Sequence, residues 1–259
     1  MIHATAIIHP GAELAEDVEI GPYAIIGSHV KIGKGTKVGP HAVVEGWTSI
    51  GEQNQIFQMA SVGAIPQDLK YRGEETYLKI GDRNIIREFA TIHLGTVTGD
   101  GETTIGSNNL FMAYSHVAHD CHIGNGVVMA NAATLAGHVA VEDYVILGGL
   151  CAIHQFTRIG ESAMIGGGTL VGHDIPPYTI ATSGDRREAA LRGLNLVGLK
   201  RRGFSDELIG QLKKAYKILC LSGLKLGDAV ARIREEVPAG PEMNHFLEFI
   251  ESAKRGITR

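Results

Sequence analysis

The sequence predicts a mainly β protein, a parallel β-helix over residues 1–178 followed by a C-terminal α-helical domain over 179–259. An aliphatic residue recurs at every sixth position from 2 to 62, at 80, 86 and 92, and from 105 to 171, with only Phe111 and Met129 as exceptions. Pro176 and Pro177 then end the repeat, because proline cannot donate a hydrogen bond to a strand ladder.

A period of six fits neither an α-helix nor a heptad, but it suits a short extended segment followed by a corner. Three such segments close a triangular coil of about 18 residues, and successive coils stack at roughly 4.8 Å, the spacing of paired strands. The repeated aliphatic side chains then point inward and form the core. The 34 glycines of the chain suit a solenoid with many corners.

Two polar excursions interrupt the repeat, over residues 68–79 and 98–104. A loop that leaves a rigid scaffold is a common place for binding and catalytic residues. A tolerated surface insertion is the alternative interpretation, and it has more weight for the second loop. Both segments are therefore candidate functional loops.

After the repeat, apolar spacing and capping residues predict helices. Ser205 is a candidate N-cap, because its hydroxyl can accept a hydrogen bond from the first helical turn, and Pro241 suits a first helical position. The expected helices cover about 187–202, 205–221, 228–237 and 241–256.

Composition excludes several classes of function. A net charge of -4 and a pI near 6.3 give no general attraction to nucleic acid or to anionic membranes. Cys121, Cys151 and Cys220 form no CxxC pair, which suits a reducing compartment. The N-terminus enters the repeat without a basic or an apolar leader segment, and no apolar run reaches membrane length, so we expect neither a signal peptide nor a membrane span. We expect a cytoplasmic protein without a membrane span and without a nucleic-acid partner.

The histidines follow the coil spacing once the seven extra residues of the second excursion are removed. His93, His119 and His138 then lie one residue more than a coil apart, so we expect them to stack on one edge of the prism. A single surface histidine is usually a solvated polar side chain without a catalytic role. It is the alignment of several histidines in successive coils that indicates a functional site. Further members of this edge would be His116, His122, His154 and Gln155.

Two chemistries could use such a column. A neutral imidazole is the usual general base for activating a hydroxyl group. Three imidazoles from adjacent coils could instead hold Zn²⁺, as in the γ-class carbonic anhydrases, which share this kind of solenoid. No HxxxxH pair stands in a suitable context, and we expect neither a metal nor a tightly bound cofactor. A purely structural solenoid is a third interpretation.

Eight segments carry a family resemblance: QDLKY (67–71), IGDRNIIRE (80–88), TIHLGT (91–96), HVAHDC (116–121), TLAGHV (134–139), IHQF (153–156), DIPPY (174–178) and GLKRRGF (198–204). Together and in this order they resemble the acyl-[acyl-carrier-protein] UDP-N-acetylglucosamine O-acyltransferases of lipid A biosynthesis. The resemblance implies a left-handed β-helix and a homotrimer with active sites between subunits. It also implies transfer of a (3R)-3-hydroxyacyl group from acyl carrier protein to the glucosamine 3-hydroxyl of the UDP-sugar. Another sugar acyltransferase of the hexapeptide-repeat class is the alternative enzyme.

The resemblance also assigns roles to residues. His119 would be the general base, Asp120 its assistant, and the backbone N–H of Gly137 an oxyanion donor. Strand alternation points neighbouring side chains apart, which counts against the Asp120 role unless a corner intervenes. Substrate binding would fall to Asp68, Lys70, His93, His116, His138, His154, Gln155, Asn195, Arg201 and Arg202.

Three positions bear on specificity. Val197 stands where the family has a glutamate, and about three residues are inserted between Ala181 and Asn195, so we expect base recognition to differ. Gly167 matches the position that limits acyl-chain length in the family. Because glycine leaves the groove open, the expected acyl chain is long, hydroxymyristoyl-like rather than hydroxydecanoyl-like.

Overall fold

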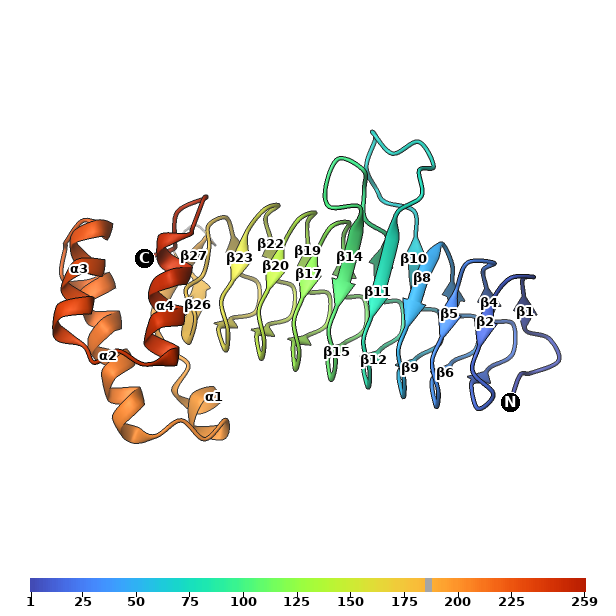
Figure 1. Ribbon diagram of the computed structural model, residues 1–259, viewed down its shortest axis with the longest axis horizontal. Helices are drawn as coiled ribbons and strands as arrows, with labels where there is room; N and C mark the ends of the chain where they lie inside the picture. Colours follow the sequence, from blue (N-terminus) through green and yellow to red (C-terminus); the bar gives the residue numbers. More distant parts are fainter. Residues whose placement is uncertain (185–187) are drawn as a thin grey trace.

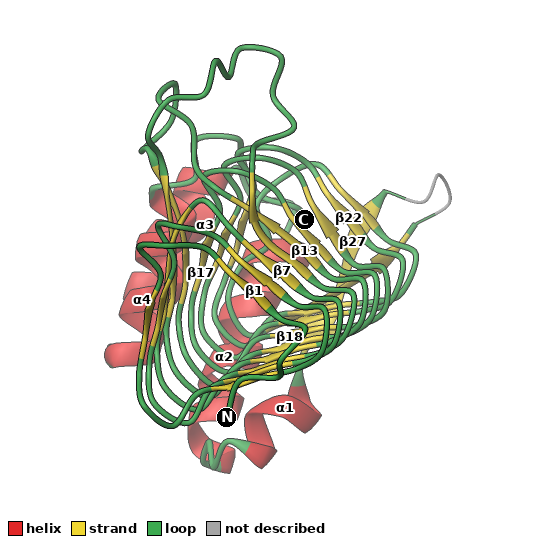
Figure 2. Ribbon diagram, turned by 90° about the vertical axis from the view of Figure 1, so that its right-hand side faces the viewer, coloured by secondary structure: helices red, strands yellow, loops and turns green. Residues whose placement is uncertain are grey.

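The computed structural model describes residues 1–184 and 188–259, and in it three sheets wind around one axis (Figures 1 and 2). The first sheet contains β1 (Ile7–Ile8), β4 (Ile25–Ile26), β7 (Val43–Val44), β10 (Ser61–Ala64), β13 (Thr91–His93), β16 (His116–Val117), β19 (Thr134–Leu135), β22 (Ala152–Ile153) and β25 (Leu170–Val171). The second contains β2 (Glu13–Leu14), β5 (Lys31–Ile32), β8 (Trp47–Ile50), β11 (Tyr77–Ile80), β14 (Glu102–Ile105), β17 (His122–Ile123), β20 (Ala140–Val141) and β23 (Arg158–Ile159). The third contains β3 (Glu19–Ile20), β6 (Lys37–Val38), β9 (Gln55–Ile56), β12 (Ile85–Ile86), β15 (Leu110–Phe111), β18 (Val128–Met129), β21 (Ile146–Leu147), β24 (Met164–Ile165), β26 (Thr179–Ser183) and β27 (Ala189–Leu194).

The coil is left-handed. Seen from the N-terminal end in Figure 2, the chain passes from the first sheet to the second and then to the third in a counterclockwise sense as it recedes from the viewer. All pairings between coils are parallel, and β26 with β27 is the antiparallel exception. The predicted left-handed parallel β-helix is therefore confirmed.

The repeated aliphatic residues form the core of the solenoid. In the first sheet, Ile26, Val44, Val62 and Ile92 are aligned in successive strands and have no solvent exposure. The residue before each of them points outward. Full burial of one such side chain contributes about 1.5–3 kcal/mol, so the ladders supply the main stabilisation of the coils.

Both polar excursions are present as loops on the same side of the solenoid, above β11 and β14 in Figure 1. They occupy residues 65–76 and 94–101, a few positions earlier than predicted. The predicted ends were wrong, since 77–79 and 102–104 belong to β11 and β14. These two strands are four residues long and pair with each other along their whole length, so the chain rejoins the sheet before the next aliphatic position.

The helix predicted over 187–202 is wrong for most of its length. Its expected first residue, Arg187, lies outside the described residues; Ala189–Leu194 forms β27, and only Leu196–Arg201 is helical, as α1. The apolar spacing that suggested one helix arises from two elements, since Leu191 packs on the solenoid core and Leu199 on the helical core. β27 pairs antiparallel with β26 and extends the third sheet at its end.

Three longer helices complete the chain: α2 (Asp206–Leu221), α3 (Leu226–Glu236) and α4 (Pro241–Glu251). The predicted caps at the N-termini of α2 and α4 are confirmed, since the Ser205 hydroxyl accepts from the Leu208 N–H and Pro241 opens α4. α4 ends before the predicted Gly256. The boundary at residue 178 stays a prediction: Tyr178 packs in the helical core, whereas the adjoining β26 still pairs with β24.

Candidate active site

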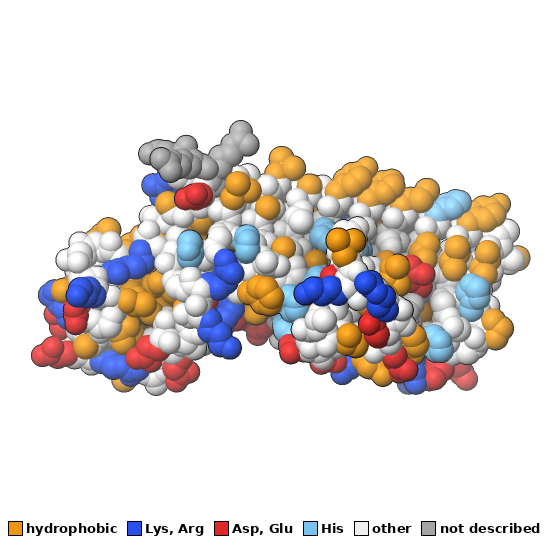
Figure 3. Space-filling model, turned by 90° about the horizontal axis from the view of Figure 1, so that it is seen from above, with side chains coloured by type: hydrophobic (Ala, Val, Ile, Leu, Met, Phe, Trp, Pro, Cys, Tyr) orange, Lys and Arg blue, Asp and Glu red, His pale blue; other side chains and the backbone are white. Residues whose placement is uncertain are grey.

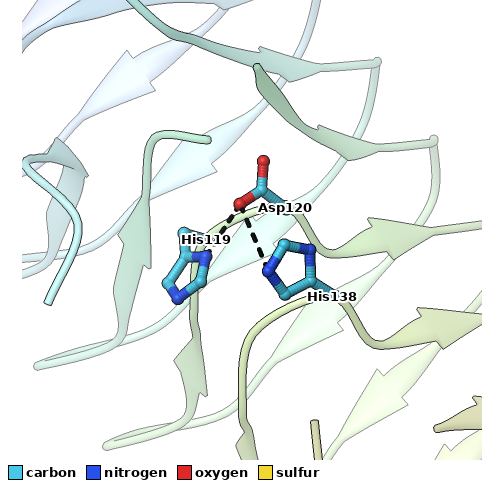
Figure 4. Close-up of side chains that lie close together, drawn as sticks. All are labelled: His119, Asp120 and His138. Carbon is cyan, nitrogen blue, oxygen red and sulfur yellow. Dashed lines mark hydrogen bonds and ion pairs between the residues drawn. The ribbon is translucent and has the colours of Figure 1, made fainter. Parts of the chain in front are cut away.

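The turn between β16 and β17 places a histidine and an aspartate side by side. Asp120 has a φ of 56°, in the left-handed region that non-glycine residues seldom adopt. This turn cancels the alternation of a regular strand, and the Nδ1 atom of His119 lies 2.8 Å from the Oδ2 atom of Asp120 (Figure 4). The corner therefore brings together two neighbouring side chains that a strand would separate.

The protonation states of this pair follow from its surroundings. Burial of the Asp120 carboxyl raises its pKa, but hydrogen bonds from His119 and Thr96 outweigh burial and hold the pKa below its ordinary value. An ionised carboxylate only accepts hydrogen bonds, so Nδ1–H of His119 is the donor and Nε2 carries the free lone pair. The His119 side chain keeps 16% exposure, so Nε2 can meet a substrate.

Two threonines from the second loop and the following strand hold the aspartate. The backbone N–H of Thr96 donates to Oδ1 of Asp120 at 2.9 Å, and its hydroxyl donates to Oδ2 at 2.6 Å. The backbone N–H of Asp120 donates to the Thr103 hydroxyl at 2.9 Å. Sequence reasoning missed both threonines. The available signal was that the TIHLGT motif ends on Thr96, where the chain has just left the coil.

A second histidine approaches the same carboxylate from the next coil. Nε2 of His138 lies 3.8 Å from Oδ2 of Asp120, and its ring meets the His119 ring edge-on at 5.0 Å (Figure 4). On its other face His138 stacks on Phe156 at 4.5 Å. Burial lowers the pKa of His138, which favours its neutral form. It can therefore offer a neutral ring nitrogen to a bound ligand.

The predicted histidine column is two edge-on pairs and not one stack. His93 meets His116 at 5.0 Å, as His119 meets His138. The β13–β16 register pairs Thr91 with His116, so it is His116 and not His119 that approaches the His93 ring edge-on. Burial lowers the pKa of His93 to about 4 and also lowers the pKa of His116, whose Nδ1 lies 2.7 Å from the Thr91 hydroxyl.

Gly137 lies directly against the His119 ring. A Cβ atom at position 137 would stand 2.5 Å from Cε1 and 2.7 Å from Nε2 of His119. Only glycine leaves room for the ring in this place. Within the described part of the chain, the backbone N–H of Gly137 donates to no protein acceptor, so it is available to a ligand.

The first loop extends over the same face. Asp68 and Lys70 lie in it, where the Lys70 N–H donates to Oδ1 of Asp68 at 2.9 Å. A small pocket joins the two loops, with Tyr71, Thr96 and Thr98 among its walls. The negative charge of Asp68 reaches His138, opposing the lowering of the His138 pKa. Figure 3 shows histidine side chains along this face beside a protruding group of Lys and Arg side chains.

His154 and Gln155 follow β22 on the same corner and are exposed. The β19–β22 register places Gln155 one coil beyond Gly137, as the spacing predicted. Nδ1–H of His154 donates to the Gln155 carbonyl oxygen at 3.1 Å, which leaves Nε2 and the Gln155 amide directed to solvent.

The predicted residues of the C-terminal segment have a different setting. Asn195 caps α1, accepting from the Gly198 N–H and donating to the Ser162 carbonyl, so both ends of its side chain are occupied. Arg202 binds Glu161 at 2.6 Å and lies over the Tyr144 ring at 3.7 Å. In Figure 1, α1 lies below the C-terminal end of the solenoid, whereas the two loops project above its middle coils. One chain does not bring α1 to His119.

Gly167 lies at an exposed corner after β24. A Cβ atom built there would meet only the Gly149 backbone, with its carbonyl oxygen at 3.2 Å. Successive glycines at 149 and 167 leave this corner open. Each helix in residues 1–184 and 188–259 is too short or too polar to cross a membrane.

Comparisons with known proteins agree with this geometry. The family described as bacterial transferase hexapeptide (six repeats) matches residues 1–34 and 102–137, and the family described as Udp N-acetylglucosamine O-acyltransferase, domain 2, matches 174–258. A protein of Trichlorobacter lovleyi named acyl-[acyl-carrier-protein]–UDP-N-acetylglucosamine O-acyltransferase is 68% identical over 100% of this chain and 99% of its own.

Solved structures give the same result. LpxA from Acinetobacter baumannii matches with a TM-score of 0.96 and 47% identity, covering 100% of this chain and 99% of that one. The UDP-N-acetylglucosamine acyltransferase of Francisella novicida matches with a TM-score of 0.95 and 40% identity, covering 100% and 94%.

A left-handed solenoid of six-residue repeats with a histidine–aspartate pair at one corner defines a hexapeptide-repeat acyltransferase. More narrowly, the full-length matches show that the chain belongs to the acyl-[acyl-carrier-protein]–UDP-N-acetylglucosamine O-acyltransferase family. The resemblance found in the sequence is confirmed.

Proposed function

We propose that the chain transfers a (3R)-3-hydroxyacyl group from acyl carrier protein to the glucosamine 3-hydroxyl of UDP-N-acetylglucosamine, the first step of lipid A biosynthesis. Family membership supports the donor and the acceptor. The observation that carries the chemistry is the His119–Asp120 pair, with Nε2 of His119 open to a substrate and Gly137 packed against the same ring.

The geometry supports a direct transfer. Nε2 of His119 takes the proton of the sugar hydroxyl while its oxygen attacks the thioester carbonyl, and the carbonyl oxygen becomes an oxyanion. The Gly137 N–H donates to that oxyanion, a contact worth about 3 kcal/mol. Asp120 stabilises the imidazolium of His119. The carbon–sulfur bond then breaks, and the imidazolium returns the proton to the departing thiolate of the carrier protein.

Substrate contacts follow from the surrounding residues. The loop residues Asp68 and Lys70 are placed to hold the sugar and its phosphate, because they extend over the histidine face. Neutral imidazoles can both donate hydrogen bonds to sugar hydroxyl groups and accept hydrogen bonds from them. The two histidine pairs and the exposed residues that follow β22 suit this role. We assign sugar and acyl-amide contacts to His93, His116, His138, His154 and Gln155.

The test is incubation with UDP-N-acetylglucosamine and 3-hydroxyacyl carrier protein, with detection of the sugar ester by mass spectrometry. A 3-amino analogue of the acceptor, assayed in parallel, measures whether the site prefers an alcohol or an amine. Absence of an acylated UDP-sugar with both acceptors would contradict the proposal.

Zinc chemistry is the second candidate, since ligand atoms of His119, Asp120 and His138 lie within 4.8 Å of one another. Both oxygens of Asp120 already accept from Thr96, and Oδ2 also accepts the Nδ1 proton of His119, which a metal would have to displace. We therefore propose catalysis without metal or cofactor. Turnover should survive dialysis against a strong chelator, with no zinc found by elemental analysis.

We also propose a homotrimer with sites shared between subunits and a location in the cytoplasm. The separation of α1 from His119 within one chain supports sharing, because Arg201 and Arg202 can bind the diphosphate only from a neighbouring subunit. Their guanidinium groups suit phosphate oxygens. Sedimentation equilibrium should give a mass about three times the 27.7 kDa of the chain. A species of 27.7 kDa would contradict the trimer.

Substitution of Gly167 by methionine should shift selectivity toward shorter acyl chains. The wild-type corner leaves the groove open, and a methionine side chain would fill it beside Gly149. The measurement is kcat/KM with 3-hydroxyacyl carrier proteins of increasing chain length. One methylene in an apolar pocket is worth about 10–200-fold, so the preferred length should fall by several carbons. An unchanged chain-length profile would refute the role of Gly167.

A further inference from the structure

The second loop, residues 94–101, is built onto the catalytic carboxylate. Its residue Thr96 is only 2% exposed, and the Asp120 carboxylate is fully buried beneath it. Thr96 donates twice, from its backbone N–H to Oδ1 and from its hydroxyl to Oδ2 of Asp120. Oδ2 is also the oxygen that accepts from His119. The loop thus contacts the atom that orients the base.

Two donors on two oxygens fix a carboxylate more closely than one. With Oδ1 and Oδ2 both held, the carboxylate plane cannot rotate about its bond to Cβ, so Oδ2 stays directed at Nδ1 of His119. Hydrogen bonds to an ionised group are about twice as strong as neutral ones, and those of Thr96 lie in a buried setting. The same oxygen lies 3.8 Å from Nε2 of His138, and a small rotation would direct it to that ring.

The loop also covers the carboxylate. A Cβ atom at position 99 would stand 2.5 Å from Oδ1 and 2.7 Å from Oδ2 of Asp120, so only glycine allows the loop backbone to lie so close. The N–H of Gly99 donates to the Thr96 carbonyl oxygen at 3.0 Å, which closes the loop as a tight turn over the carboxylate. The loop thereby shields from water the two Asp120 oxygens that accept hydrogen bonds from Thr96.

We propose that Thr96 is a positioning residue for the acyl transfer, acting through Asp120 to hold His119 in the Nδ1–H form with Nε2 directed at the acceptor. The second loop is then part of the catalytic apparatus and not a tolerated insertion. This inference rests on the proposed function for its kinetic test, and on the hydrogen bonds alone for its structural test. Thr96 itself touches neither substrate nor the reacting atoms.

The experiment compares Thr96→Val with Thr96→Ser and with the matched control Thr98→Val. Valine keeps the shape of threonine and the backbone N–H but removes the hydroxyl donor, and serine restores it. Thr98 lies in the same loop, is exposed, and contacts Thr96 but not Asp120. Thr96→Val should lower kcat about 10–100-fold, the value of one hydrogen bond to a charged group, with KM for the UDP-sugar unchanged. Thr96→Ser and Thr98→Val should stay close to the wild type.

A second measurement is independent of turnover. Imidazole ¹⁵N NMR of histidine-labelled protein should show His119 as the Nδ1–H tautomer in the wild type and a smaller fraction of it in Thr96→Val, at an unchanged melting temperature. The same tautomer in both proteins would overturn the inference, as would a Thr96→Ser enzyme as slow as Thr96→Val. A wild type that forms no sugar ester would instead refute the proposed function, and the NMR comparison would still decide the role of Thr96.

Discussion

Replacement of His119 by alanine is expected to lower kcat for sugar acylation by about 10²–10⁴-fold, the usual contribution of a general base. Because Nδ1 of His119 donates to Asp120, Nε2 carries the free lone pair, and Gly137 lies against the ring on this side. Without the imidazole, the sugar hydroxyl must lose its proton to water. KM for the UDP-sugar should change little, since the proton is transferred only in the transition state.

His122, in the next strand after His119, provides a matched control. His122 also pairs with an aspartate, since its Nε2 lies 3.0 Å from Oδ2 of Asp100, but that pair is largely exposed. His122→Ala removes the same ring from the same coil, and its turnover should remain close to that of the wild type. Equal rates for wild type and His119→Ala, measured with both variants folded by circular dichroism, would defeat the general-base assignment.

The solenoid could be predicted from the sequence because its cause is periodic. Each sixth residue points into the core and must be aliphatic. A chain that folds into 18-residue coils therefore shows this period in its sequence. Strand β27 was not predictable in this way, because Leu191 and Leu199 pack in two different cores while their spacing imitates that of one helix.

The sequence indicated which residues share one edge of the solenoid but not the geometry of the candidate site. Spacing brought His119 and His138 onto one edge, yet alternation along a strand argued against any contact between His119 and Asp120. That contact is allowed by the left-handed φ of 56° at Asp120, which lies at a corner three positions after the inward Val117. The TIHLGT motif included Thr96 but indicated no role for it, because its two donors reach Asp120 only after the second loop closes over the coil.

Corner glycines were equally ambiguous in the sequence, since Gly137 could have been no more than a turn residue. Its φ is not in the left-handed region, so conformational freedom does not explain it. The contact with the His119 ring does. The need for glycine at position 137 is therefore a property of the candidate site, and a substitution can test it.

Gly137→Ala is expected to lower kcat by up to about 10²–10⁴-fold, the usual contribution of a general base, because the new methyl group displaces the His119 ring. The added Cβ would stand 2.5 Å from Cε1 of His119, so the ring must turn and Nδ1–H must leave Asp120. The backbone is not strained by alanine here, and the melting temperature should stay near that of the wild type. Gly172→Ala is the matched control, since it lies at the same corner of a later coil with no atom within 4 Å of its added Cβ.

A double-mutant cycle decides how Gly137 acts. If alanine at 137 harms catalysis only by displacing the imidazole, then it should cost nothing further once His119 is already alanine, and the double variant should match His119→Ala in kcat. A further loss in the double variant would show that the methyl group also obstructs the thioester, since no ring is left to displace. Additive losses would thus separate an effect on the thioester from the steric need that the His119 ring imposes.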